Sequence, residues 1–174
     1  MPSERPRELA RGKHLSLLDL AGWEFASRVG CTSVVAISAR TDDDHLVLVR
    51  QHRPAIGGPC LELPAGLVGD SEQLAGEAPL EAARRELLEE TGYQAETWFE
   101  HACGFTSAGL TDERITLFGA RDLHKVTEGG GVDGENIETV LAPIQGFQSW
   151  VDRQRDEVAG IDLKVYLALV PWET

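Results

Sequence analysis

Cysteine is scarce in this chain, and its placement argues against two classes of small protein. The 3 cysteines, Cys31, Cys60 and Cys103, lie far apart, and no C-x-x-C pair is present. An odd number of cysteines without paired spacing disfavours both a disulfide framework and a structural zinc site. We therefore expect reduced thiols in the core.

Positive charge is also in short supply. Lys and Arg number 16 against 29 Asp and Glu, so the formal net charge is −13 at pH 7. This charge predicts no binding to nucleic acid or to an anionic membrane. A small anionic substrate is still compatible with it, provided that a bound cation and a few Arg residues reverse the local field.

Long apolar runs are absent as well. No stretch approaches the roughly 18 apolar residues of a membrane span, and the charged residues 1–12 lack the apolar segment of a secretory leader. These features predict a cytoplasmic protein with residues 1–12 disordered or loosely attached. A length of 174 residues suits one domain with a substantial core.

Residues 77–93, EAPLEAARRELLEETGY, are the most informative stretch. Pro79 suits the first position of a helix and Gly92 suits the left-handed cap beyond its end, so we expect a helix over residues 79–91. Because a helix advances by roughly 100° per residue, one face can be buried. The residues on that face are Leu80, Ala83 and Leu87.

Three carboxylates, Glu86, Glu89 and Glu90, share the adjoining arc of this helix. Like charges one turn apart repel, and negative charge at a helix C-terminus costs about 0.3–1 kcal/mol per group. Shared divalent cations would offset the cost, because Mg²⁺ takes oxygen ligands. A solvated acidic helix face is the alternative explanation.

The pattern Glu77-x7-Arg85-Glu86-Leu87-x-Glu89-Glu90-x-Gly92-Tyr93 resembles the Nudix box, the signature of Nudix hydrolases. The Gly that opens the motif is Gly66 of LELPAGL, so the loop ahead of the helix carries an insertion of about five residues. The resemblance implies Mg²⁺ or Mn²⁺ held by Glu86, Glu90 and Glu89 and by the backbone carbonyl of Ala65. It also implies that Glu77 supports the motif by pairing with Arg85.

A glycine loop follows at residues 128–137 and contains GGGVDG. This matches G-x-G-x-x-G, but the strand before it and the helix after it that a dinucleotide fold needs are missing. Resemblance to the ADP-ribose-hydrolysing branch implies that an acidic residue here is a further metal ligand or the general base. Glu135 fits best, then Asp133, and Glu89 is a further catalytic candidate. A solvated acidic loop is the alternative.

Five further residues are expected to contact the substrate. The segment Trp23–Arg28 resembles the first strands of ADP-sugar diphosphatases, in which an aromatic ring stacks on adenine and an Arg holds the base or a phosphate; a structural Trp is the alternative. Arg53 offers a planar fork of donors to the diphosphate. Glu62 is expected near a ribose hydroxyl, and Leu67 completes the set.

The remaining pattern predicts an α/β fold. A hairpin turning at Ala21-Gly22 precedes a set of strands, the helix at 79–91, and two C-terminal helices at 143–157 and 162–170. The predicted strands are residues 14–20, 23–28, 32–39, 46–51, 60–63, 97–104, 114–120 and 137–142. Leu163, Tyr166, Leu167 and Val170 are expected to point inward. This order predicts an α/β/α sandwich with a mixed sheet and an N-terminal antiparallel hairpin, which is the Nudix fold.

Residues 1–30 are thus expected to form a dimerisation element and residues 31–174 the hydrolase domain. Resemblance implies a homodimer, for which the first strand supplies Leu15, Leu17, Leu18 and Leu20. The predicted activity is metal-dependent cleavage of ADP-ribose or another ADP-sugar. The alternatives are GDP-mannose, coenzyme A, a dinucleoside polyphosphate or a nucleoside triphosphate as substrate, or a non-catalytic nucleotide-sensing module.

Overall fold

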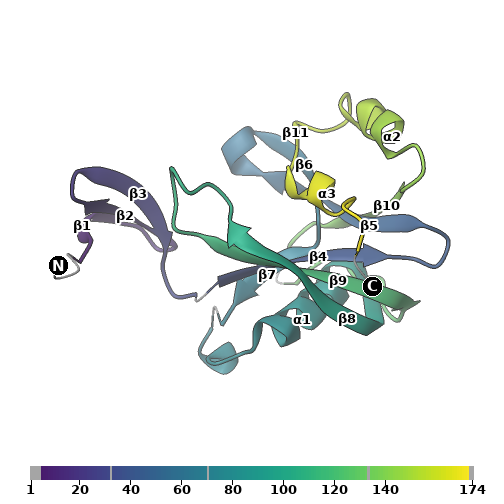
Figure 1. Cartoon of the computed structure of the whole chain (residues 1–174), viewed down its shortest axis with the longest axis horizontal. Helices are drawn as coiled ribbons and strands as arrows, with labels where there is room; N and C mark the ends of the chain where they lie inside the picture. Colours follow the sequence, from purple (N-terminus) through teal and green to yellow (C-terminus); the bar gives the residue numbers. More distant parts are fainter. Residues whose placement is uncertain (1–4, 32, 70, 133, 173–174) are drawn as a thin grey trace.

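The N-terminal strands form a small sheet that projects from the rest of the molecule (Figure 1). The computed structural model describes residues 5–31, 33–69, 71–132 and 134–172. The sheet has the order β1 (Arg7–Arg11), β2 (Leu15–Leu20), β3 (Trp23–Arg28). Ala21 and Gly22 join β2 to β3 with φ of 54° and 84°. Positive φ at both positions is what a tight hairpin turn requires, so the predicted hairpin is confirmed.

The expectation that residues 1–12 are disordered or loosely attached is wrong for Arg7–Arg11. These residues pair with β2 in antiparallel fashion. The Glu8 side chain adds hydrogen bonds from Arg11 and from Ser16 on β2. Hydrogen bonding to β2 therefore orders this segment, even though its charged side chains remain in water.

The other described strands form one larger mixed sheet with the order β11-β6-β5-β4-β9-β8, in which β10 pairs with β5 and β7 with β4. The β4–β9 and β6–β11 pairs are parallel and the others are antiparallel. The strands are β4 (Ser33–Arg40), β5 (His45–Arg53), β6 (Gly58–Glu62), β7 (Ala65–Val68), β8 (Tyr93–Phe105), β9 (Arg114–Lys125), β10 (Glu138–Pro143) and β11 (Gly160–Ile161). β7 and β11 are not among the predicted strands, and β8 and β9 are longer than predicted.

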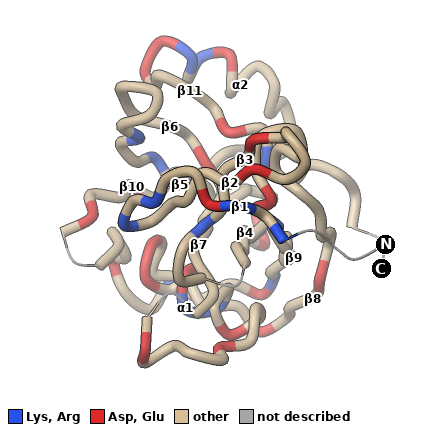
Figure 2. Tube along the Cα trace, turned by 90° about the vertical axis from the view of Figure 1, so that its left-hand side faces the viewer, with Lys and Arg blue, Asp and Glu red and all other residues tan. Residues whose placement is uncertain are grey.

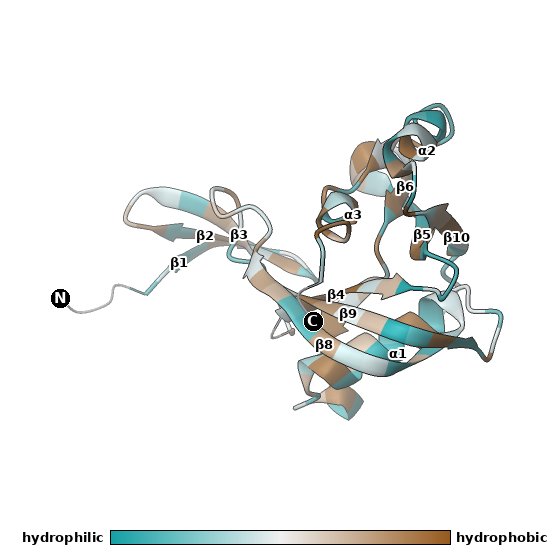
Figure 3. Ribbon diagram, turned by 45° about the vertical axis from the view of Figure 1, so that its right-hand side comes forward, coloured by the Kyte–Doolittle hydropathy of each residue, from teal (hydrophilic) through white to brown (hydrophobic). Residues whose placement is uncertain are grey.

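Helices cover both faces of this sheet (Figure 3). α1 (Pro79–Thr91) packs on one face, and α2 (Phe147–Gln154) and α3 (Lys164–Leu167) pack on the other. Alternate residues of β4 point to opposite faces: Val35 and Ile37 join the core under α1, whereas Ala36 joins the core under α2 and α3. The predicted α/β/α sandwich is confirmed.

The two C-terminal helices are shorter than expected. The chain after α2 runs along the edge of β6 as β11 instead of starting a helix. At the far end of α3, Arg40 donates to the carbonyls of Ala168 and Val170, at 2.6 and 3.3 Å. Its guanidinium also lies 3.8 Å from the centroid of the Trp172 ring. These contacts hold the chain in an irregular course where a longer helix was predicted.

Three of the four residues expected to point inward from this segment do not. Leu163 is 79% exposed, and Leu167 and Val170 are also exposed. Val165 and Ala168 fill the core in their place. Because the helix has only four residues, helical spacing does not extend across the segment and cannot choose its buried face.

Acidic residues are spread over the molecule, and the three cysteines lie in different environments. Asp and Glu are distributed over both sheets and over the helices (Figure 2). All three cysteines are free; Cys60 is buried, but Cys31 is half-buried and Cys103 exposed, so only one is a core thiol. Within the described part of the chain, no helix has the length and hydropathy of a membrane span.

Leu87 on α1 is buried, whereas Leu163, just ahead of α3, is exposed. Replacing each leucine with alanine should therefore destabilise the protein strongly at position 87 and hardly at position 163. Leu87→Ala should lower the free energy of unfolding by about 2–5 kcal/mol, because Leu87 is fully buried beneath the sheet. The control Leu163→Ala should change it by no more than about 0.5 kcal/mol. Urea titration followed by circular dichroism measures both. A large loss for Leu163→Ala would restore that residue to the core.

Candidate active site

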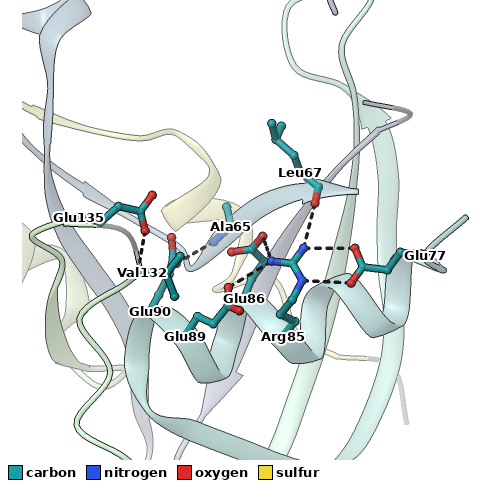
Figure 4. Close-up of polar contacts among 9 residues, drawn as sticks. All are labelled: Ala65, Leu67, Glu77, Arg85, Glu86, Glu89, Glu90, Val132 and Glu135. Carbon is teal, nitrogen blue, oxygen red and sulfur yellow. Dashed lines mark hydrogen bonds and ion pairs between the residues drawn. The ribbon is translucent and has the colours of Figure 1, made fainter. Parts of the chain in front are cut away.

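Glu86 and Glu90 on α1 face the start of β7. Glu90 is buried, with 5% of its surface exposed, and one of its carboxylate oxygens accepts the backbone N–H of Ala65 at 3.1 Å. The Glu86 carboxyl lies against Gly66, where an added Cβ would overlap it. A side chain at position 66 would therefore displace the Glu86 carboxyl from its place beside β7. Figure 4 shows these carboxylates pointing toward the Ala65 turn.

Arg85 ties the acidic residues of α1 together (Figure 4). Its guanidinium donates to both oxygens of Glu77, at 3.0 and 3.2 Å, which confirms the predicted pairing. It also donates to Glu86 at 2.7 Å, to Glu89 at 3.2 Å and to the carbonyl of Leu67 at 3.2 Å. These partners, Glu77 first, raise the pKa of Arg85. One cation thereby offsets the repulsion that the sequence pattern creates.

The insertion between Gly66 and Glu77 leaves this network intact. The chain continues β7 to Val68 and then forms a short 3-10 turn, η2 (Glu72–Leu74). The N–H of Glu77 donates to the Leu74 carbonyl at 2.9 Å. The extra residues therefore fold back on themselves and return Glu77 to Arg85.

The glycine loop docks on the C-terminal end of α1. The N–H groups of Gly130 and Gly131 donate to the carbonyls of Glu90 and Glu89, each at 2.9 Å. Gly129, Gly130 and Gly131 all have positive φ, and a Cβ at Gly129 would lie 2.5 Å from the backbone of Thr91. Gly130 and Gly131 thus satisfy two carbonyls that a helix end leaves unpaired. Sequence reasoning missed this contact, although a run of three glycines after an acidic helix is its visible signal.

Docking of the loop brings Glu135 to the carboxylates of α1. Glu135 accepts the backbone N–H of Val132 at 3.2 Å, as Figure 4 shows. It lines the same cavity as Glu86 and Glu90. Asp133, the second candidate in this loop, lies outside the described residues.

That cavity has a volume of about 600 Å³ and gathers most of the predicted site. Two predicted residues, Trp23 and Glu89, are not among those that line it. The predicted residues that do line it are Arg28, Arg53, Glu62, Ala65, Leu67, Glu86, Glu90 and Glu135. Cys60 also lines it, but burial raises the pKa of its thiol to about 12, so it is no candidate nucleophile.

Each Arg of the cavity is held by a carboxylate. Arg53 donates to both oxygens of Glu62, at 2.7 and 2.6 Å, so Glu62 orients Arg53; its contact with a ribose hydroxyl stays a prediction. Arg28 pairs with Glu113. Glu113 is 85 positions away in the sequence, and no local pattern marks it as a partner.

The aromatic candidate lies beside the cavity rather than in it. Trp23 is 62% exposed and lines a separate pocket of about 270 Å³ with Phe25 and Phe105. The loop at residues 107–113 joins this pocket to the core: the Ala26 N–H donates to the Leu110 carbonyl at 2.8 Å. The small sheet is therefore fastened to this loop, with Trp23 and Arg28 at opposite ends of β3.

The donor set suits a hard divalent cation. Burial, together with the neighbouring Glu86 and Glu135 carboxylates, raises the pKa of Glu90 to about 8, although the Ala65 N–H opposes the shift. Crowded carboxylate oxygens beside a backbone carbonyl are ligands that Mg²⁺ and Mn²⁺ accept. Among the described residues, no group of three or more His, Cys, Asp or Glu side chains is arranged to hold a metal ion. Arg85 bonds Glu86 and Glu89. The types of ligand atom present are nevertheless those that Mg²⁺ or Mn²⁺ would accept.

Comparison with known proteins agrees with this geometry. A family model described as the NUDIX domain matches residues 31–155. The chain therefore belongs to the Nudix family.

Particular relatives carry more specific names. An ADP-sugar pyrophosphatase of Mus musculus is 48% identical over 143 residues, which is 77% of this chain and 62% of the mouse protein. An ADP-ribose pyrophosphatase of Bacillus subtilis (strain 168) is 34% identical over 107 residues, 62% of this chain and 55% of that protein. The chain thus spans less than two thirds of either relative. A crystal structure of an ADP compounds hydrolase has a TM-score of 0.64 at 21% identity, covers 85% of this chain and 80% of its own, and shares the fold.

The raised pKa of Glu90 predicts that a charge-removing substitution stabilises the metal-free protein. The folded state holds this proton more tightly than the unfolded chain, whose ordinary value is 4.5, so the free energy of unfolding falls as the pH rises from 4.5 to 8. Glu90→Gln avoids that loss and should be more stable than wild type by about 2–5 kcal/mol near pH 8, but not near pH 5.

Thermal unfolding of both proteins in chelator across this pH range measures the difference. Glu72→Gln on η2 is the control, because Glu72 is exposed. A wild-type and Glu90→Gln difference that stays constant with pH would contradict the assignment.

Proposed function

We propose that this protein hydrolyses the diphosphate linkage of ADP-ribose or another ADP-sugar to AMP and a sugar phosphate, with Mg²⁺ or Mn²⁺ as cofactor. One observation carries the proposal: Glu86, Glu90, Glu135 and Ala65 line one cavity together with Arg28 and Arg53. The names of the mouse and Bacillus relatives support the choice of substrate.

Each residue has a distinct part in this reaction. Glu86, Glu89 and Glu90, with the Ala65 carbonyl, would hold the cations, which supply charge neutralisation and a more acidic bound water. Arg53, oriented by Glu62, binds a phosphoryl oxygen. Glu135, or Asp133 as the second choice, takes a proton from the attacking water. The water oxygen bonds to phosphorus, the bridging P–O bond breaks, and the leaving phosphate keeps that electron pair.

The adenine is assigned to the aromatic pocket. The exposed ring of Trp23 faces a site shared with Phe25 and Phe105. Stacking on an aromatic ring contributes about 1–3 kcal/mol per base. Arg28, which lines the carboxylate cavity, is assigned to the base or the adjacent phosphate. Leu67 borders the substrate from β7.

The test is a substrate panel with product identification. ADP-ribose should give AMP and ribose 5-phosphate only when Mg²⁺ or Mn²⁺ is present. GDP-mannose, coenzyme A, a dinucleoside polyphosphate and a nucleoside triphosphate in the same panel test the other substrates. Absence of hydrolysis throughout, with ligand binding retained, would favour a sensing module instead.

Variants assign the roles within that panel. Glu90→Gln should lose turnover while keeping its fold. Glu135→Gln should lower kcat by about 10²–10⁴-fold with little change in KM, because it removes the base and not the binding groups. Glu128→Gln, an exposed acid at the edge of the same loop, is the matched control. Wild-type kcat in Glu135→Gln would remove its role as base.

The domain boundary near residue 30 and a homodimer are further parts of the proposal. The projecting sheet exposes apolar side chains to solvent, which favours a protein interface. They are Leu15 and Leu17, which share one face of β2, together with Leu9 and Leu20. A second copy, meeting the same surface about a two-fold axis, would cover them. The cytoplasmic location expected from the sequence stays a prediction.

The dimer predicts a measurable mass. Size-exclusion chromatography with light scattering should give twice the chain mass of 19.0 kDa. The double variant Leu15→Glu/Leu17→Glu should give monomer, because both side chains lie on one face of β2 and are exposed. Leu163→Glu, exposed on the C-terminal segment, should stay dimeric. A monomeric wild type would overturn this part of the proposal.

A further inference from the structure

Asp162 and Lys164 line the carboxylate cavity at the end that the proposed function leaves unused. Asp162 follows β11, and its N–H donates to the Leu61 carbonyl at 2.9 Å, one step beyond the β6–β11 pairing. The cavity wall here is thus fixed to β6 by main-chain hydrogen bonds. In Figure 1, α3, which begins with Lys164, lies beside β6.

Asp162 orients Lys164 through two hydrogen bonds. One carboxylate oxygen accepts the backbone N–H of Lys164 at 2.7 Å, and the other accepts its ammonium at 2.5 Å. Both side chains are about one quarter exposed, at 25% for Asp162 and 24% for Lys164. The ion pair uses one of the three donors of the ammonium. Its direction is therefore set while it can still donate to a ligand.

Three cavities follow one another across the molecule. The pocket of Trp23 shares Asp112 with a smaller pocket of about 190 Å³. That pocket shares Arg28 and Glu113 with the carboxylate cavity. The carboxylate cavity then extends along the sheet order from β9 and β4 to β6 and β11, where it reaches Lys164. A substrate with its base at Trp23 and its diphosphate at α1 would extend its remaining part toward Lys164, at the other end of this cavity.

We propose that Lys164, positioned by Asp162, donates a hydrogen bond to a hydroxyl of the sugar beyond the diphosphate and so selects substrates with a sugar there. This inference rests on the proposed function. A hydroxyl both donates and accepts, and an ammonium–carboxylate pair offers both partners. The pair has no net charge, which suits a neutral hydroxyl better than an additional phosphate.

Titration calorimetry with the two halves of ADP-ribose tests the assignment. Lys164→Met in the full chain should weaken ribose 5-phosphate binding about tenfold, the effect of losing a charged hydrogen bond. AMP and inorganic phosphate should stay within about twofold of wild type. Asp162→Asn should act in the same direction, and Lys164→Arg should restore part of the affinity. Lys13→Met, at an exposed position in the connection between β1 and β2, is the matched control.

Kinetics give a second readout. Lys164→Met should raise KM for ADP-ribose about tenfold with kcat nearly unchanged, because the contact is far from the reacting phosphorus. Unchanged ribose 5-phosphate affinity, or an equal loss for inorganic phosphate or AMP, would overturn the inference. If Lys164→Met fails to fold, Lys164→Arg and Asp162→Asn decide. A wild type that does not cleave ADP-ribose overturns the proposed function alone, since the titration requires no turnover.

Discussion

The docking of Gly129–Gly131 on the end of α1 is the contact on which the site depends. Two N–H groups of the loop satisfy the carbonyls of Glu89 and Glu90, the same residues whose side chains form the acidic cluster. The helix end is thereby capped, and Glu135 is delivered to the cluster by the same hydrogen bonds. Any side chain at Gly129 would meet the helix backbone. Loop and helix are therefore one structural unit, although some 40 residues of chain separate them.

Arg85 is the second half of this arrangement. It spreads one positive charge over Glu77, Glu86 and Glu89, while Glu90, which lies apart from it, has the raised pKa. Arg85 thus relieves the repulsion among the carboxylates that it contacts. Repulsion between Glu90 and its neighbours Glu86 and Glu135 remains on the side of α1 that faces Ala65. Such retained electrostatic cost is typical of functional sites rather than of stable scaffolds.

Local information was sufficient for α1 and insufficient for what surrounds it. The helix and its Pro79 and Gly92 boundaries follow from helical periodicity and cap chemistry. The Glu77–Arg85 pair follows from resemblance to the Nudix box, within the same 17 residues of sequence. The β7 and β11 strands and the early end of α3 depend on partners elsewhere: Arg40, for example, reaches carbonyls about 130 residues away. Similarly, Glu113 becomes a partner of Arg28 only because the small sheet is fastened to the loop at residues 107–113. Contacts between residues so far apart produce no periodic pattern in the sequence from which they could be predicted.

The charge balance of the large cavity has a consequence for the order in which ligands arrive. Three cations line it, Arg28, Arg53 and Lys164, and each is already neutralised by its own carboxylate. Glu135 adds a further carboxylate, and Glu90 adds another when the pH exceeds its raised pKa. These carboxylates disfavour a bare diphosphate and also repel one another. In the proposed reaction, a divalent ion and the nucleotide would each offset the repulsion that the other meets, so their affinities would be thermodynamically linked and each would tighten the other.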